Sequence, residues 1–234
     1  MIKCIVFDVG RTLMEYVDMP NVWTEYYRTA FEYANEKLNL AFDADKINRA
    51  VEILRSFNPT VNYREKEISP TVIFENIKNE LQINVDTQRF ISVFFDSFHF
   101  KAVIYSDTVE VLKKLNEKGY IIATLTDVAT GMPDELHKSY FKELMPFFDM
   151  YVSSSSCGFR KPNPKGVFDI AEKFNLKKNE IIFVGDEKKD MKTAENFGCL
   201  SVLIDRKNQN NNYGQNFTVH NLSELLNVLQ EIGC

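Results

Sequence analysis

The N-terminal stretch IKCIVF, residues 2–7, is followed at once by DVGRTL, residues 8–13, and this junction decides the fold. Its apolar and β-branched residues run almost without interruption, which predicts a strand buried on both faces. The Asp-Val-Gly sequence that follows predicts a loop. Asp8 therefore stands at the carboxyl end of a buried strand, the place where open parallel sheets bind their ligands.

The same apolar character returns in later segments. These are residues 120–125, 149–153, 181–184 and 200–204. Segments with helical periodicity alternate with them, at residues 107–118, 164–175, 188–197 and 222–232. Alternating strands and helices predict a parallel sheet with helices on both faces. The predicted fold class is therefore α/β, with a Rossmann-like core.

The region between about 19 and 99 interrupts this alternation. It has no convincing buried strand and reads as helical over residues 20–38, 44–57, 70–82 and 86–98. An all-helical block after the first strand of such a sheet predicts an inserted cap domain with linkers near 15–19 and 99–106. The expected division is a core of residues 1–16 and 102–234 and a cap of residues 17–101.

Composition sets broad limits on function. Hydrophobic residues make up 44%, charged residues 26%, and the net charge is -5, as in an ordinary globular protein. This mild acidity argues against a nucleic-acid-binding face, which needs clustered Lys and Arg. No apolar stretch has the length of a membrane span, and the first one is too short for a signal peptide. Cys4, Cys157, Cys199 and Cys234 suggest neither a zinc site nor a disulfide framework. The expected location is the cytoplasm, and composition says nothing of oligomeric state.

Polar residues follow the predicted strands at four places. A strand-end Asp such as Asp8 can attack phosphorus and form an aspartyl phosphate, although a turn-forming Asp is as common. Thr126, at the end of 120–125, offers a hydroxyl for phosphoryl oxygens, although a structural Thr is commoner there. Lys161, in the Pro-rich loop RKPNP, can neutralise a carboxylate and a phosphoryl group, or lie in solvent. Asp186 and Asp190, after VG, can bind Mg2+ or complement a helix dipole.

Taken in order, these segments resemble the haloacid dehalogenase superfamily across essentially the whole chain. The family pattern is Asp-x-Asp-x-Thr, then a strand ending in Thr or Ser, then a Lys, then Gly-Asp with a second acid. The matching residues are Asp8 and Thr12, Thr126, Lys161, Gly185-Asp186 and Asp190. The helical insertion resembles the family's C1-type cap, that of subfamily I. A lone Asp-Val-Gly would carry no such weight, but four ordered motifs are specific.

The resemblance implies a role for each matching residue. Asp8 would be the nucleophile and a Mg2+ ligand, with Thr126 and Lys161 holding the phosphoryl group. Asp186 would bind the metal, Asp190 would do so directly or through another group, and the carbonyl of Gly10 would complete the ligands. Thr12 would support the nucleophile loop beside the substrate. The implied function is a Mg2+-dependent phosphatase of a small phosphorylated metabolite.

Gly10 departs from the family pattern. The family's phosphatases carry a second Asp there, which protonates the leaving oxygen, and such help is worth roughly 10²–10⁴-fold. Three explanations remain open: substrates with good leaving groups such as acyl or aryl phosphates, a substitute acid, or a catalytically impaired phosphometabolite-binding protein. The nearest substitutes are Glu15, Tyr16 and Asp18.

Two further departures concern charge near the motifs. Arg11 stands where Gly is common, and its guanidinium can bind an anionic substrate group, point into solvent or pair with an acidic cap residue. Asp127 stands where Asn is frequent, next to the expected phosphoryl site. A carboxylate there is unfavourable unless it is paired or turned away.

Other chemistries of the superfamily remain as rivals. Haloacid dehalogenases also lack the second Asp, but they need no metal, so the intact Gly185-Asp186 and Asp190 favour phosphoryl transfer. Phosphonate cleavage would need a cap lysine, for which Lys37, Lys46, Lys66 and Lys78 are available. The cap would set substrate choice through residues such as Tyr16, Trp23, Tyr27, Tyr63 and Arg64, although most cap aromatics form its core.

Overall fold

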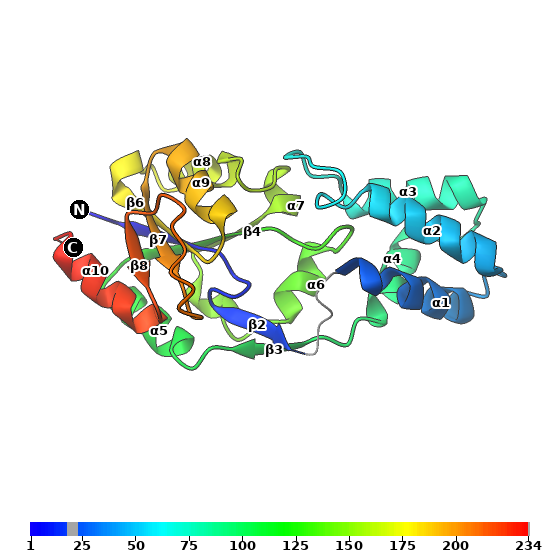
Figure 1. Ribbon diagram of the computed structural model, residues 1–234, viewed down its shortest axis with the longest axis horizontal. Helices are drawn as coiled ribbons and strands as arrows, with labels where there is room; N and C mark the ends of the chain where they lie inside the picture. The colour runs from blue at the N-terminus through cyan, green and yellow to red at the C-terminus, as the bar shows by residue number, and fades with distance from the viewer. Residues whose placement is uncertain (18–22, 234) are drawn as a thin grey trace.

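The computed structural model describes residues 1–17 and 23–233. Figure 1 shows a sheet with its helices at one end of the molecule and the helices α1 to α4 gathered at the other. Both chain termini lie at the sheet end, far from these helices. Among the described residues, none of the helices combines the length and the apolar character that a membrane span requires.

The sheet is parallel throughout and places β1 at its centre. Its strands are β1 (Cys4–Phe7), β4 (Ile121–Thr126), β5 (Met150–Ser153), β6 (Ile181–Gly185), β7 (Leu200–Ile204) and β8 (Phe217–Val219). The strand order is β5-β4-β1-β6-β7-β8. The predicted α/β class is confirmed, and each of the five predicted strands is present, while β8 was not predicted. The segment 217–219 is too short and too polar at its centre to be recognised from sequence.

Helices cover both faces of the sheet, as the unbroken apolar strands predict. Alternate residues of β1 point to opposite faces. Ile5 and Phe7 pack in one core cluster with α5 (Thr108–Glu117) and α10 (Leu225–Glu231). Cys4 and Val6 pack in the other with α8 (Lys165–Lys173) and α9 (Lys188–Phe197). β1 is thus held from both sides, and its carboxyl end is a fixed point for the site.

The predicted helical region forms a bundle with a core of its own. Its helices are α1 (Tyr27–Leu38), α2 (Ala44–Ser56), α3 (Pro70–Leu81) and α4 (Thr87–Asp96). The side chains of Asp43, Ser69 and Asp86 accept hydrogen bonds from the first turns of α2, α3 and α4, which explains where these helices begin. Phenylalanines from several of the helices stack in its interior.

The expected linkers are paired strands. β2 (Met14–Val17) and β3 (Lys101–Ile104) form an antiparallel ribbon in which Met14 lies opposite Ile104. The segments are short and only half buried, so the sequence lacks the apolar run that marks a core strand. Figure 1 shows this ribbon between the sheet and the bundle. Asp18 and the side chain of Trp23 lie outside the described part of the chain.

Short elements complete the fold, and those outside the predicted helices 20–38 and 222–232 were not predicted. They are α6 (Asp134–Ser139), α7 (Ser154–Cys157) and the 3-10 turns Trp23–Glu25, Met145–Phe147, Lys178–Glu180 and Leu222–Glu224. The last of these occupies the first turn of the predicted helix 222–232. Elements of one or two turns carry too few residues for a helical repeat to emerge.

The bundle core yields a stability prediction. Phe94 is fully buried, with ring centroids 4.8 Å from Phe31 and 5.3 Å from Phe74. Phe94→Ala should cost about 3–5 kcal/mol through the cavity it leaves. Hydrogen exchange should accelerate in α1 to α4 while β1 and β6 keep their protection. Equal acceleration in the sheet would mean that bundle and sheet unfold as one unit.

Candidate active site

Three adjacent strands bring the sequence motifs together. β4, β1 and β6 are neighbours in the sheet, and at their carboxyl ends stand Thr126, Asp8 and Asp186. Asp8 and Thr126 are buried, with 6% and 3% of their surfaces exposed. Parallel pairing alone explains this convergence of residues that are between 60 and 178 positions apart in the sequence. The expected clustering of these motifs is therefore observed.

Lys161 stands at the centre of the cluster. Its Nζ lies 2.5 Å from Asp8 Oδ1 and 2.6 Å from Asp190 Oδ1, and its side chain is 1% exposed. The two carboxylates raise the pKa of Lys161 even though burial by itself acts in the opposite direction. The ammonium therefore stays charged and bridges a residue of the first motif to one of the fourth.

Carboxylates outnumber this cation. One oxygen each from Asp8, Asp186 and Asp190 lie within 4.8 Å of one another. Burial, with repulsion between these carboxylates, raises the pKa of Asp8 to about 7 and that of Asp186 to about 6, although Lys161 acts against both shifts. The excess of negative charge in a buried space is what a divalent cation would neutralise.

The residues fit a magnesium ion. Mg2+ binds oxygen at about 2.1 Å, so two of its ligands lie at most about 4.2 Å apart. The oxygens of Asp8 and Asp186 lie within 4.8 Å of one another, close to that limit. The two carboxylates therefore stand where both could contribute to one metal site.

The fourth motif depends on a glycine. A Cβ on Gly185 would lie 2.5 Å from the Cβ, Cγ and Oδ2 atoms of Asp190, closer than side chains approach. Only a residue without a side chain lets the start of α9 press against the end of β6. Asp190 Oδ2 there accepts a hydrogen bond from the backbone N–H of Glu187 at 2.8 Å, while its Oδ1 faces Lys161.

Arg11 meets acids of the fourth motif. Its Nε lies 3.1 Å from Asp186 Oδ2, and its guanidinium also pairs with Glu187. Among the described residues, no partner from the helical bundle was found for it, although an acidic residue of that region was one expectation. Arg11 adopts the left-handed backbone conformation, with φ of 59°, in which an L-residue is strained. Its side chain is 55% exposed, so it remains accessible to a ligand.

Asp127 is both paired and turned toward the protein. Its Oδ1 accepts the backbone N–H of Lys161 at 3.1 Å, and its Oδ2 lies 3.2 Å from Lys189 Nζ. Burial alone would raise its pKa, but Lys189, Lys161 and Arg160 hold the pKa of this carboxyl below its usual value. Asp127 is therefore not a free negative charge at the end of β4. Asp127 fixes the loop that carries Lys161.

Thr12 and Gly10 complete the first motif. Thr12 is fully buried, and its main-chain oxygen accepts a hydrogen bond from Arg206 at 2.9 Å, which suits support of the loop better than contact with substrate. Gly10 does not use a conformation reserved for glycine, and no described atom lies within 4 Å of a Cβ placed on it. A side chain at this position therefore has room.

A cavity of about 420 Å³ opens on the outer side of Asp186. Its lining has five cationic and three acidic side chains, Arg11 and Lys188 among the cations, but does not include Asp8, Thr126 or Lys161. It adjoins Asp186 and does not enclose Asp8. A cationic lining of this kind attracts anions toward the site.

Sequence reasoning did not identify several residues that shape the site. Glu187 and Lys189 pair with Arg11 and Asp127, and Glu67 of the bundle pairs with Arg160, next to Lys161. The first two stand inside the fourth motif, where their charge was a usable signal. Glu67 is 93 positions from Arg160, so nothing local could have indicated it.

Fold and site together define a haloacid dehalogenase-like enzyme, and comparison with known proteins agrees. The sequence pattern of the haloacid dehalogenase-like hydrolases matches residues 2–198, so the chain belongs to this family. It is 24% identical over 203 residues to a phosphoglycolate phosphatase of Aliivibrio fischeri, covering 87% of this chain and 84% of the relative. It is 25% identical to a phosphoglycolate phosphatase of Vibrio vulnificus, covering 97% and 96%.

Solved structures share the fold. A 2-haloacid dehalogenase from Pseudomonas syringae pv. Tomato aligns with a TM-score of 0.69 at 17% identity over the full length of both chains. A haloacid dehalogenase-like phosphatase from Thermococcus onnurineus aligns with a TM-score of 0.63 at 18% identity, covering 97% of this chain and 98% of its own. At such identities the likeness concerns the fold alone.

The raised pKa of Asp8 predicts how stability depends on pH. An unfolded Asp titrates near 3.9, while folded Asp8 titrates at about 7, so the folded protein binds more protons between these values and loses stability as pH rises through them. Asp8→Asn removes this loss. Without metal, the variant should be more stable than the wild type at pH 8, on the order of 2 kcal/mol, with a smaller gain at pH 4.5.

Urea unfolding in EDTA measures both free energies. If Asp8→Asn is less stable than the wild type by the same amount at pH 8 and pH 4.5, the charge on Asp8 does not destabilise the folded protein.

Proposed function

We propose that this hydrolase is a Mg2+-dependent phosphatase of small phosphorylated metabolites that works through an aspartyl phosphate on Asp8. The observation that supports this best is the buried cluster in which Lys161 Nζ lies 2.5 Å from Asp8 Oδ1 beside Asp186 and Asp190. It combines a carboxylate nucleophile, a fixed cation and an excess of oxygen ligands. Phosphoryl transfer through an aspartyl phosphate uses each of these.

The reaction divides into two displacements at phosphorus. An oxygen of Asp8 forms a bond to the phosphorus, and the bond to the leaving alkoxide breaks with its electron pair. The alkoxide then takes up a proton. Water next attacks the phosphorus of the acyl phosphate, the bond to Asp8 breaks, and the carboxylate and inorganic phosphate are released. Burial of Asp8 limits the access of competing groups.

Asp8, Asp186 and the main-chain oxygen of Gly10 would hold the metal ion. A bound Mg2+ would supply charge neutralisation between the carboxylate and the phosphoryl group. Asp190 has a second role open to it, because both its oxygens already accept hydrogen bonds, from Lys161 and from Glu187. It then acts by orienting the ammonium of Lys161 toward Asp8.

Thr126 and Lys161 would bind the phosphoryl oxygens. Thr126 ends β4 next to the loop of Asp127, and Lys161 is held by three contacts, to Asp8, Asp190 and Asp127. A preorganised cation costs little rearrangement when charge develops on the phosphoryl group. Thr12 and Asp127 would support these residues from behind. Arg11 remains a candidate for an anionic group of the substrate.

The substrate class follows from charge and from the relatives. Phosphoglycolate phosphatases at 24–25% identity point to a small phosphorylated acid. The cationic cavity beside Asp186 suits such an anion. The helices α1 to α4 would act as the cap, because the loop between α2 and α3 contacts the loop that carries Lys161. Such a cap would exclude water from the reacting groups.

Gly10 has no side chain that could donate a proton to the leaving group, so another residue would have to do so. Glu15 accepts a hydrogen bond from the hydroxyl of Tyr105 at 3.3 Å, and Tyr105 lines the cavity beside Asp186. The ring of Tyr16 packs on Tyr140 with centroids 5.4 Å apart, and burial raises the pKa of Tyr16, which weakens it as a proton donor. Of the two, Glu15 is the better replacement.

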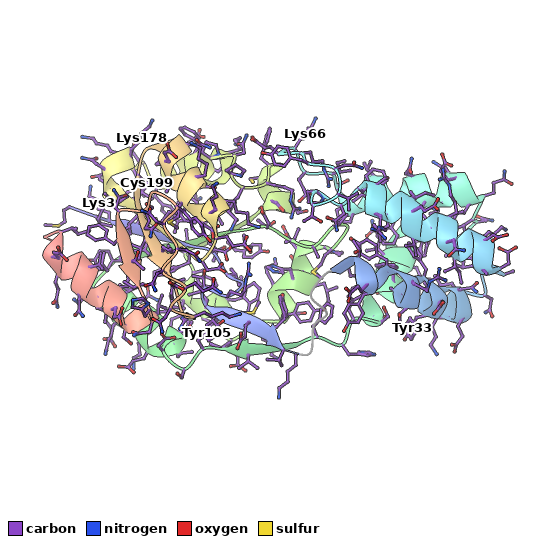
Figure 2. The ribbon with its side chains drawn as sticks, viewed as in Figure 1. Lys3, Tyr33, Lys66, Tyr105, Lys178 and Cys199 are labelled. Atoms are coloured by element: carbon purple, nitrogen blue, oxygen red, sulfur yellow. The ribbon has the colours of Figure 1, made fainter. Side chains whose placement is uncertain are left out.

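The rival chemistries have less support. Dehalogenation needs no metal, and the cluster of Asp8, Asp186 and Asp190 would then be without purpose. For phosphonate cleavage, Lys37 and Lys78 pair with acids on their own helices. Lys66 is the candidate whose segment touches the core, but its side chain is exposed (Figure 2). A binding protein without turnover would not need a buried carboxylate whose pKa is raised as far as that of Asp8.

A phosphatase assay tests the proposal. Phosphate release from a panel of small phosphomonoesters, including phosphoglycolate, should require Mg2+ and stop on addition of EDTA. Asp8→Asn should reduce turnover by at least 10³-fold, since it removes the nucleophile, while the far-UV spectrum stays unchanged. Halide release that persists in EDTA would support dehalogenation and contradict the proposal.

Gly10→Asp tests the missing proton donor. Because the new side chain has room, the variant should fold normally. Turnover of alkyl phosphates, whose alkoxides need a proton, should rise roughly 10-fold or more. Turnover of aryl phosphates should change little, because their phenolates leave without help. Equal changes for both classes would reject this account of Gly10.

A further inference from the structure

The loop between α2 and α3 reaches across to the core and pairs with it. Lys66 forms an antiparallel bridge with Phe159, the N–H of Glu67 donates to Gly158 O at 2.9 Å, and the N–H of Arg160 donates to Glu65 O at 2.6 Å. Figure 2 labels Lys66 on this loop, where it approaches the core. The bundle thus makes an isolated β-bridge with the segment that leads directly into Lys161.

The Glu67 side chain is the most heavily bonded group of this contact. It is 5% exposed. Its Oε2 accepts the hydroxyl of Ser154 at 2.7 Å and pairs with the guanidinium of Arg160, and its Oε1 lies 3.4 Å from Arg64 Nη2. Hydrogen bonds that involve a charged partner are stronger than neutral ones, and a buried carboxylate is tolerated only when it is satisfied in this way.

The partners of Glu67 lead into both phosphoryl-binding loops. The hydroxyl of Ser154 accepts the N–H of Val128 at 3.1 Å, and the guanidinium of Arg160 donates to Val128 O at 3.0 Å. Val128 follows Thr126 by two residues, and Arg160 precedes Lys161. One carboxylate from the bundle therefore holds, through two intermediaries, the main chains on which Thr126 and Lys161 are mounted.

We propose that Glu67 is a positioning residue that makes the geometry of Thr126 and Lys161 depend on the docking of the bundle. With the bundle docked, both polar main-chain groups of Val128 and the start of the Lys161 loop are fixed. With the bundle displaced, Ser154 and Arg160 lose the carboxylate that aligns them. The catalytic part of this inference rests on the proposed phosphatase function, whereas the structural coupling does not.

The test uses Glu67→Gln in the full-length protein, with Glu65→Gln as matched control. Glu65 lies on the same segment, and its side chain bonds to Tyr63 and to Asn163 of the Lys161 loop but touches neither Ser154 nor Arg160. Glu67→Gln should speed amide hydrogen exchange at Val128 and Lys161 about tenfold, as expected for loss of one charge-assisted hydrogen bond, and leave Phe183 in β6 unchanged. Glu65→Gln should leave exchange at Val128 at the wild-type rate, because its side chain has no contact that leads to Val128.

Turnover and phosphate binding supply the catalytic readout. In Glu67→Gln, kcat for the best phosphomonoester should fall about tenfold and inorganic phosphate should bind more weakly, both measured well below the melting temperature of the variant. Ser154→Ala should produce the same pattern to a smaller degree, and the double variant should be no worse than Glu67→Gln alone, because both act through Val128. Should Glu67→Gln fail to fold, Ser154→Ala carries the test.

Two outcomes overturn the inference. If the amides of Val128 and Lys161 exchange at the wild-type rate in Glu67→Gln and in Ser154→Ala, Glu67 does not hold these loops. Faster exchange without any change in turnover or phosphate binding, in an active enzyme, shows that the hold has no catalytic consequence. A wild type that hydrolyses no phosphomonoester contradicts the proposed function instead, and the exchange arm then decides the coupling alone.

Discussion

The arrangement of this molecule depends on one buried ion pair network, the ammonium of Lys161 between Asp8 and Asp190. It joins the end of β1 to the start of α9, while Asp127 fixes the same lysine from the end of β4. Removing Lys161 from this network would leave its buried carboxylates without their cation, which is far more costly than never having buried the pair. Gly185 permits this approach, because a Cβ there would lie 2.5 Å from Asp190.

The sequence predicted the sheet and the converging motifs because both arise from short-range signals. Unbroken apolar runs identify β1, β4, β5, β6 and β7, and parallel pairing then brings their carboxyl ends together without further information. Asp8, Thr126 and Asp186 follow those runs directly. The ribbon of β2 and β3 was taken for linkers because strands of four half-buried residues have no distinctive pattern.

Contacts between distant segments could not be predicted in the same way. The partner of Arg11 was expected among solvent, substrate or the helical region, and it belongs to the fourth motif. Glu67 carried no sequence signal at all, since an acid in a polar loop is ordinarily a solvated residue. Glu67 is buried because the bundle and the sheet, each with its own hydrophobic core, contact each other there. That contact depends on the ribbon and on the loop lengths rather than on any local sequence pattern.

The ribbon of β2 and β3 has a consequence for how this architecture can change. The chain enters the bundle after β2 and leaves it through β3, and these two strands are hydrogen-bonded to each other about 5 Å apart. The segment between those two strands therefore leaves the sheet and returns to it at one place. Its length and sequence can change without altering the spacing of the strands β1, β4 and β6, whose carboxyl ends carry Asp8, Thr126 and Asp186.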